Sequence, residues 1–190
     1  MIVLQGVTKH FALNPRPTLD ALDLHVAAGE FCVLVGANGC GKSTLLQVVG
    51  GQLAVESGLC QVRARAAHVT QDVHASTVAE MTVLENMALR LTLAPCFAWY
   101  ARHRMRAYAL LQEVGLGLEA FLDQPIGVLS GGQRQVIATI MALHSGEKLL
   151  LLDEHTSALD PDVQQRLMRY TAEKVQHMGL TVLMITHSFA

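Results

Sequence analysis

The segment 36–44, which reads GANGCGKST, constrains the fold of this chain more than any other stretch. It fits the pattern G-x-x-x-x-G-K-S of a loop that binds phosphate groups. Gly36, Gly39 and Gly41 lack a Cβ, so the backbone can adopt positive φ and point successive N–H groups at an anion. The apolar run 31–35 before the loop predicts a buried strand, and residues 43–53 predict a helix whose N-terminus faces the phosphates. The segment therefore predicts an α/β fold with a phosphate site.

Two side chains of this loop have specific expected roles toward a nucleoside triphosphate. Lys42 places a positive charge between the β- and γ-phosphates, and the Ser43 hydroxyl is a natural ligand for Mg²⁺. A chance glycine loop would not require a strand before it and a helix after it. The flanks therefore favour a functional loop, although the motif alone indicates only a broad class.

Composition excludes several other classes of protein. The chain has 190 residues, enough for one domain with a subdomain, and no apolar run approaches the roughly 20 residues that span a bilayer. A charged-then-apolar signal peptide is absent from its start, so we expect a cytosolic protein. The net charge of −2 does not indicate a nucleic-acid partner. The four cysteines have no metal-ligand spacing and are expected to be reduced thiols.

The start of the chain predicts an antiparallel pair of strands. Residues 2–11 and 19–28 have strand-like composition, and a loop with two prolines separates them. Apolar and polar residues alternate over 22–26, which predicts a half-exposed sheet. Phe11 has two interpretations on spacing alone: an aromatic ring that stacks on adenine, or a core phenylalanine.

Helical patterns predominate between the loop and residue 130. Residues 61–70 predict a short strand that ends at Gln71, and residues 72–128 predict a helical subdomain inserted into the α/β unit. Thr82 and Glu85 match a capping box at the start of one helix, and residues 98–114 predict another. The basic run at 102–106 is expected to be a solvated helix face, with contact to an anionic partner as the alternative.

A second anion-binding helix end is predicted at residues 129–133, which read LSGGQ. Ser130 and the glycines precede a helix expected over 134–144. Four leucines at 149–152 predict a strand buried on both faces. Asp153 and Glu154 follow at its carboxyl end, where sheets of this type place their ligands. Asp153 can hold Mg²⁺ through water, and Glu154 can orient or deprotonate an attacking water.

The last predicted elements end in a histidine. Asp160 suits a helix N-cap and Pro161 the first turn of a helix that runs to about Met178, with Gly179 as its stop. A buried strand follows over 181–185. His187 comes directly after it, beside the other strand ends, where contact with a γ-phosphate is credible.

These residues together resemble the nucleotide-binding subunit of an ATP-binding-cassette (ABC) transporter over nearly the whole chain. The most specific feature is LSGGQ at 129–133 placed shortly before LLLLDE at 149–154. The resemblance implies a P-loop NTPase core with a mostly parallel sheet, flanking helices and an N-terminal antiparallel β element. It implies one ABC ATPase domain, with residues 1–71 and 131–190 as the α/β core and residues 72–130 as the helical subdomain.

The resemblance also implies the site residues. Glu154 is the general base, Gln71 senses Mg²⁺ and the attacking water, and His187 is the switch histidine. Phe11 stacks on adenine, residues 157–160 cross a dimer interface, and Ser43, Gln71 and Asp153 serve the metal. The nucleotide-binding set is Phe11, Gly36, Asn38, Gly39, Cys40, Gly41, Lys42, Ser43, Thr44, Ser130, Gly131, Gly132 and Gln133.

The implied partners follow from the implied mechanism. Two copies, or a pair of cassettes, face each other head to tail, and ATP on the loop of one copy is capped by Ser130–Gln133 of the other. Hydrolysis releases the pair and drives a separate membrane permease between conformations. The implied cofactors are ATP and Mg²⁺. A solute-binding protein is a further implied partner, nucleic acid is not, and the implied location is the inner face of the cell membrane.

Three departures from the family pattern affect these expectations. The chain is short between Lys42 and Gln71, His155 stands where proline is common, and the chain stops three residues after His187. The C-terminal part of the usual domain is therefore expected to be absent. Residues 153–161 resemble a bacterial subgroup linked to uptake of aromatic amino acids, of tryptophan or tyrosine type, or related small solutes.

Two other functions stay open at this point. A soluble ABC ATPase of translation or DNA maintenance would usually carry tandem cassettes or a long coiled-coil insert. A truncated nucleotide-binding remnant would bind ATP with little turnover. Uptake by a transport ATPase is the leading hypothesis, and the cargo is not predicted.

Overall fold

The computed structural model describes residues 1–12, 15–70, 72, 76–91, 100–156 and 159–186, and it omits the side chains of residues 100–102. The described chain divides into two units. The first unit contains residues 1–68, 147–154 and 175–190, and the second contains residues 69–146 and 155–174.

A three-stranded antiparallel sheet forms one layer of the first unit. Its strand order is β2 (Leu19–Val26), β1 (Ile2–Lys9) and β4 (Ser57–Val62), and both pairings are antiparallel. The predicted antiparallel pair at the start of the chain is therefore confirmed. Half-buried leucines and exposed polar residues alternate over 22–25 of β2, and Val26 is buried, as the alternation over 22–26 predicts.

A four-stranded sheet forms a second layer of the same unit. Its order is β3 (Phe31–Val35), β7 (Thr181–Thr186), β6 (Leu149–Asp153) and β5 (Ala66–Val69), with β7 parallel to both β3 and β6. All four leucines of β6 are buried, as expected for a strand covered on both faces. The mostly parallel sheet and the antiparallel element expected from the sequence are both present.

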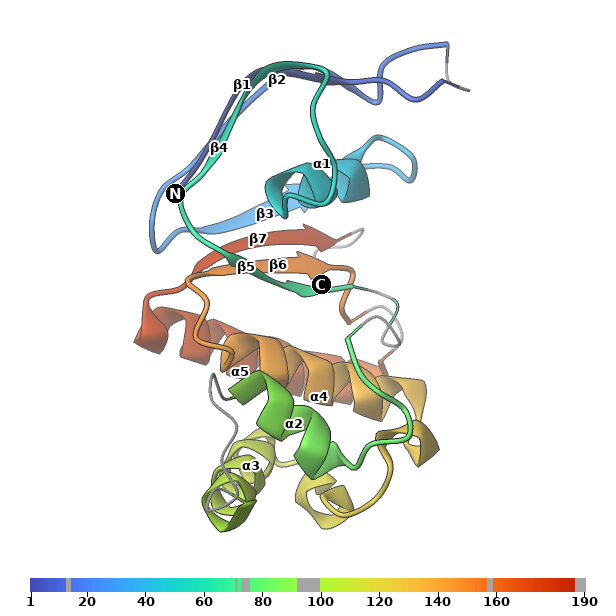
Figure 1. The fold of residues 1–190 in the computed structure, drawn as a ribbon, viewed down its shortest axis with the longest axis vertical. Helices are drawn as coiled ribbons and strands as arrows, with labels where there is room; N and C mark the ends of the chain where they lie inside the picture. The colour runs from blue at the N-terminus through green and yellow to red at the C-terminus, as the bar shows by residue number, and fades with distance from the viewer. Residues whose placement is uncertain (13–14, 71, 73–75, 92–99, 157–158, 187–190) are drawn as a thin grey trace. The chain divides into compact units, whose positions relative to one another are not determined.

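Helix α1 (Lys42–Val49) lies between the two sheets (Figure 1). Its apolar face packs in a core that draws residues from both sheets. The buried members of this core are Ile2, Leu4, Val7, Leu19, Val26, Leu45, Leu46, Val48, Val49, Leu149, Leu151, Leu183 and Ile185. Burial of the α1 side chains fixes the start of the helix, and with it the phosphate loop, against the strand ends.

Two sequence predictions in this unit need correction. The helix expected over 43–53 ends at Val49, because Gly50 is its C-cap and Gly51 takes a φ of 72°, which only glycine adopts without strain. The strand expected over 61–70 is wrong as a single element. It is the end of β4 in the antiparallel sheet and β5 in the other sheet, with residues 63–65 between them.

The second unit is helical. It contains α2 (Val83–Leu91), α3 (Tyr100–Val114), the short 3₁₀ helices η3 (Leu118–Phe121) and η4 (Ile126–Val128), and α4 (Gly131–Leu143). Most of α5 (Pro161–Met178) also belongs to it. The predicted Thr82–Glu85 capping box is confirmed, since the Glu85 carboxylate accepts from Thr82 N–H at 2.7 Å and Glu85 N–H donates to the Thr82 hydroxyl.

Candidate nucleotide-binding site

The phosphate loop turns directly from β3 into α1. Gly41 is the N-cap of α1 and has a φ of 99°, in the left-handed region. A Cβ at Gly41 would lie 2.6 Å from the carbonyl oxygen of Thr18, so no other residue fits this position. The close contact with Thr18 therefore explains why the loop needs a glycine at position 41 in particular.

Lys42 holds its own loop together. Its Nζ donates to the carbonyl oxygens of Gly36 at 2.6 Å and Ala37 at 2.8 Å, and it lies 4.0 Å from Cys40 Sγ. The ammonium group therefore sits at the mouth of the loop, where it can exchange backbone carbonyls for phosphate oxygens. The remaining predicted loop residues Asn38, Gly39 and Cys40 are exposed, and Thr44 is half-buried in α1.

Ser43 and Asp153 bring the loop and the end of β6 together. The Ser43 hydroxyl donates to Asp153 Oδ1 at 3.4 Å. The two residues are 110 positions apart in the sequence, yet the packing of α1 on β6 places them side by side. A hydroxyl and a carboxylate at this spacing form a donor set of hard oxygens, which suits Mg²⁺.

Glu154 has an unusual backbone. Its φ is 46°, in the left-handed region that non-glycine residues rarely occupy, and its N–H donates to the carbonyl of Ile185 in β7 at 3.2 Å. A proline at position 155 would restrict the preceding residue to extended conformations. His155 allows the left-handed conformation, and its burial lowers its pKa to about 4, so the ring is neutral at pH 7.

Phe11 follows β1 and is 38% exposed. The core interpretation of this phenylalanine is therefore wrong. Lys9 Nζ lies 5.7 Å from the centroid of its ring, a cation–π distance. The accessible ring is compatible with stacking on a base. Gln71, His187 and Ser157 lie outside the described residues.

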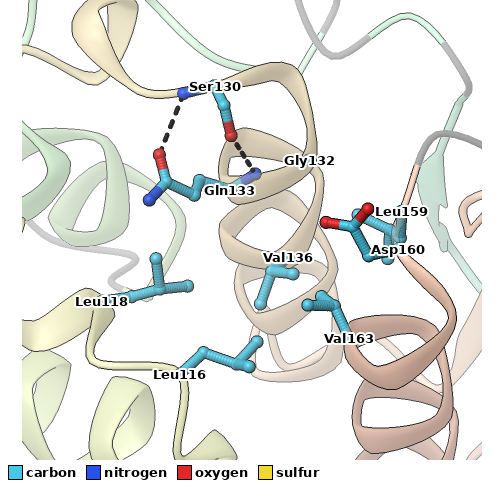
Figure 2. A pocket seen from close by; sticks show the side chains of 9 residues that line it. All are labelled: Leu116, Leu118, Ser130, Gly132, Gln133, Val136, Leu159, Asp160 and Val163. Atoms are coloured by element: carbon cyan, nitrogen blue, oxygen red, sulfur yellow. Dashed lines mark hydrogen bonds between the residues drawn. The ribbon is translucent and has the colours of Figure 1, made fainter.

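The residues of the second predicted anion site lie in the second unit. Ser130 is the N-cap of α4, which begins at Gly131, three residues earlier than the sequence predicts. Its hydroxyl accepts from Gln133 N–H at 3.2 Å, and Gln133 Oε1 accepts from Ser130 N–H at 3.0 Å (Figure 2). This reciprocal capping box fixes the orientation of Ser130 at the start of the helix.

A cavity of about 530 Å³ opens beside this helix start. Figure 2 shows that apolar side chains and the carboxylate of Asp160 both line this cavity. Its lining residues are Leu116, Leu118, Ser130, Gly132, Gln133, Val136, Leu159, Asp160 and Val163. The leucines at 116 and 118 were not predicted as part of a site, and the glycines at 115 and 117 that bend the chain there are the only sequence signal for them.

Neither an intrinsic metal cluster nor a membrane span is found in the described chain. Within these residues, no group of three or more His, Cys, Asp or Glu side chains is arranged to hold a metal ion. None of the described helices is both long and apolar enough to cross a bilayer. Ser43 and Asp153 supply two oxygens, and a Mg²⁺ ion held there would take further oxygen ligands to complete its coordination.

The chain belongs to the ABC transporter family, whose sequence model matches residues 19–157. It is 33% identical to a tyrosine transport ATP-binding protein of Clostridioides difficile, over 99% of this chain and 82% of that protein. It is 36% identical to a methionine import ATP-binding protein MetN of Caulobacter vibrioides, over 98% of this chain. The chain spans 59% of the length of that second relative.

Solved structures agree with this assignment. A dimeric ATP-binding cassette in a post-hydrolysis state, bound to ADP and Pi, superposes with a TM-score of 0.86 at 26% identity. The match covers 99% of this chain and 88% of that one. A dimeric bacterial ABC transporter cassette superposes with a TM-score of 0.85 at 27% identity, over the same shares of the two chains. The chain is thus an ATP-binding, ATP-hydrolysing cassette of a transporter, as the sequence predicts.

Proposed function

We propose that this chain drives uptake of a small solute through a separate membrane permease, as one of two cassettes that close on ATP. The observation that carries the proposal is that one chain has two helix starts of a kind that suits an anion. One is the phosphate loop in the first unit, and the other is the capped start of α4 in the second. A single bound triphosphate does not require both helix starts from the same copy, so the two starts can serve two different nucleotides.

The phosphate loop holds the nucleotide of its own copy. Backbone N–H groups between Gly36 and Thr44 surround the phosphates, and Lys42 transfers its hydrogen bonds from Gly36 and Ala37 to phosphate oxygens. The exposed ring of Phe11 stacks on the adenine. Each of these contacts uses a group that the structure leaves accessible.

Ser43 and Asp153 are the residues that would hold Mg²⁺, with Gln71 as a further proposed ligand. The hydroxyl and carboxylate oxygens, 3.4 Å apart, fit the preference of this ion. When bound, the ion neutralises charge on the β- and γ-phosphates. Asp153 is positioned for this role by β6, whose backbone pairs with β7 up to Asp153 itself.

Glu154 is the proposed general base. Its carboxylate accepts a proton from the attacking water, while the bond from its N–H to Ile185 holds the backbone at the edge of the sheet. Strained backbone of this kind persists where the surrounding structure fixes it, and it is common at active sites. Gln71 and His187 are proposed to orient the water and contact the γ-phosphate.

Ser130 completes the site of a second copy. Its oxygen already accepts from Gln133 N–H, so the hydroxyl proton remains available to donate to the γ-phosphate across the interface. The positive end of the α4 dipole reinforces that contact. Gly131 and Gly132 have no side chains that would obstruct the approach of the partner's γ-phosphate to Ser130. Residues 157–160, of which Asp160 lines the adjacent cavity, are proposed to cross the same interface.

The solute is proposed to be an amino acid or a related small molecule. The curated relatives are a tyrosine transport and a methionine import ATP-binding protein, and the run 153–161 resembles the aromatic amino-acid subgroup. The proposed partners are an integral membrane permease and a solute-binding protein. Such a subunit is cytoplasmic and lies on the inner face of the membrane through its permease.

A deletion strain of the host tests this function. Uptake of radiolabelled tyrosine, tryptophan and methionine is compared in the parent strain, the deletion strain and strains complemented with the parent chain or Glu154→Gln. We expect loss of uptake of at least one of these amino acids on deletion, and rescue by the parent chain only. Equal rescue by Glu154→Gln, or unchanged uptake of all three on deletion, would overturn the proposal.

A further inference from the structure

A histidine outside the predicted site lies on the strand next to the one that ends at Asp153, a proposed metal ligand. His68 is the third residue of β5, and β5 neighbours β6, which ends at Asp153 (Figure 1). His68, Asp153 and Ser43 all belong to the first unit. The ring of His68 is half-buried, and its Nε2 atom is buried without a hydrogen-bond partner among the described residues.

The other ring nitrogen fixes the position of the proton. His68 Nδ1 lies 3.4 Å from Nε2 of Gln52, in the turn that follows α1. With the amide nitrogen of Gln52 facing Nδ1, the tautomer that fits the contact accepts at Nδ1 and carries its proton on Nε2. Burial lowers the pKa of His68, with the carboxylate of Asp153 acting in the opposite direction, which favours this neutral form.

A buried N–H donor without an acceptor is costly and calls for a physical explanation. The Asp153 carboxylate is an anionic acceptor at the end of the neighbouring strand, and an ordered water can bridge a donor and an acceptor that do not touch. Carboxylates that bind metal ions are commonly oriented by such outer hydrogen bonds, whose loss weakens metal affinity by about 10–100-fold.

We propose that His68 is a positioning residue that orients the Asp153 carboxylate for Mg²⁺ through a water that accepts from its buried Nε2–H. The inference rests on the proposed function, because it needs Asp153 to serve the metal. His68 then acts through Asp153 and touches neither nucleotide nor metal. Gln52 contacts the His68 ring and so limits its orientation. Asp153 would then be held from two sides, by Ser43 at the start of α1 and by His68, which Gln52 contacts from the turn after α1.

The test measures ATP binding as a function of Mg²⁺ concentration, with a fluorescent ATP analogue and the full chain. The variants are His68→Phe, which keeps a ring but removes the donor, and His68→Gln, which keeps an N–H donor on a side chain of similar reach. His25→Phe is the matched control, because His25 is an exposed histidine on β2. Affinity in EDTA measures binding that does not depend on the metal.

We expect His68→Phe to raise the Mg²⁺ concentration at half-maximal enhancement by about 10-fold, with unchanged affinity in EDTA. His68→Gln and His25→Phe should keep midpoints close to that of the parent chain. An unshifted midpoint in His68→Phe, or a loss of affinity in EDTA that accounts for the whole effect, would overturn the inference. Binding by the parent chain that does not respond to Mg²⁺ would instead refute the proposed metal site.

Discussion

Lys42 has the most clearly defined chemical task at the residue scale. Its ammonium group sits at the mouth of the phosphate loop, within hydrogen-bond distance of two backbone carbonyls. Lys42→Ala removes the one side-chain cation that the loop offers to the β- and γ-phosphates. We expect a loss of ATP affinity of at least 10-fold, since charge-assisted hydrogen bonds to ionised groups contribute roughly 1.5–3 kcal/mol each.

Isothermal titration calorimetry with ATP measures this loss, and a circular dichroism spectrum identical to that of the parent chain controls for folding. Micromolar affinity retained in a folded Lys42→Ala protein would mean that the loop does not hold the phosphates.

The thiol of Cys40 offers a site for chemical modification in the same loop. Its side chain is exposed, whereas those of Cys32 and Cys60 are half-buried, and burial raises the pKa of both of these thiols. Thiolate is the reactive form, so Cys40 should react with N-ethylmaleimide before these two. The added group would fill the space between Cys40 and Lys42 and block ATP sterically.

The matched control is Cys40→Ser treated with the same reagent, which also accounts for modification of Cys96. We expect alkylated parent chain to lose ATP binding and alkylated Cys40→Ser to keep it. Full binding by parent chain with Cys40 modified, as verified by mass spectrometry, would contradict the assigned position of the loop.

At the element scale, a small polar network joins three helices of the second unit. His144 at the end of α4 lies 3.0 Å from the hydroxyl of Tyr170 in α5. Lys174 lies over the Tyr170 ring and forms a 2.6 Å ion pair with Glu113 of α3. Burial, reinforced by the charges of Lys174 and Arg106, lowers the pKa of His144 to about 4.

This shift predicts a pH dependence of stability. The unfolded chain binds a proton at His144 near pH 6.5, but the folded chain does so only near pH 4. The contribution of neutral His144 is therefore fully present above about pH 6.5 and is lost as the pH falls toward 4. With allowance for solvent screening of the half-buried ring, the loss is roughly 1–2 kcal/mol.

Urea unfolding of the parent chain and His144→Gln at several pH values between 7.5 and 4.5 isolates this histidine. The stability of the parent relative to His144→Gln should fall as the pH is lowered. A difference between the two that stays constant across this range would show that His144 titrates normally in the folded chain.

The elements that the sequence predicts well are those with local signals. The Ser130 cap and the Thr82 capping box each join residues three positions apart, and the phosphate loop is one continuous segment, 36–44, so glycines and caps specify these features directly. The position of Asp153 beside Ser43 was also predictable, because parallel strands place their carboxyl ends at one edge of the sheet.

The elements that were mispredicted depend on distant pairing. Residues 61–70 read as one strand, yet β4 pairs with β1 and β5 lies in the other sheet, a choice that only long-range contacts decide. His68 was missed for the same reason, because nothing in its own segment shows that β5 neighbours β6. The end of α1 at Gly50 and Gly51, by contrast, had a local signal that the prediction passed over.

At the scale of the whole molecule, the two halves of the proposed site belong to different units of the chain. The phosphate loop lies in the first unit, and the LSGGQ segment 129–133 lies in the second. The subdomain boundaries predicted from the sequence, at 71–72 and 130–131, remain a prediction and are separate from the division into these two units. Each copy would hold ATP on its own loop and complete the site of its partner, so ATP would join the two copies.

The most direct test of this claim is the mass of Glu154→Gln in solution with and without ATP. This variant should bind ATP but lacks the proposed general base, so the closed pair should accumulate. By size-exclusion chromatography with light scattering, we expect twice the 20.6 kDa of one chain with Mg-ATP and a single chain with ADP.

Two controls separate the halves of the site. Glu154→Gln combined with Lys42→Ala should stay monomeric because it binds no ATP. Glu154→Gln combined with Ser130→Phe should bind ATP and still stay monomeric, because only the surface that caps the partner's nucleotide is blocked. A Glu154→Gln chain that binds Mg-ATP and remains a monomer would contradict the account.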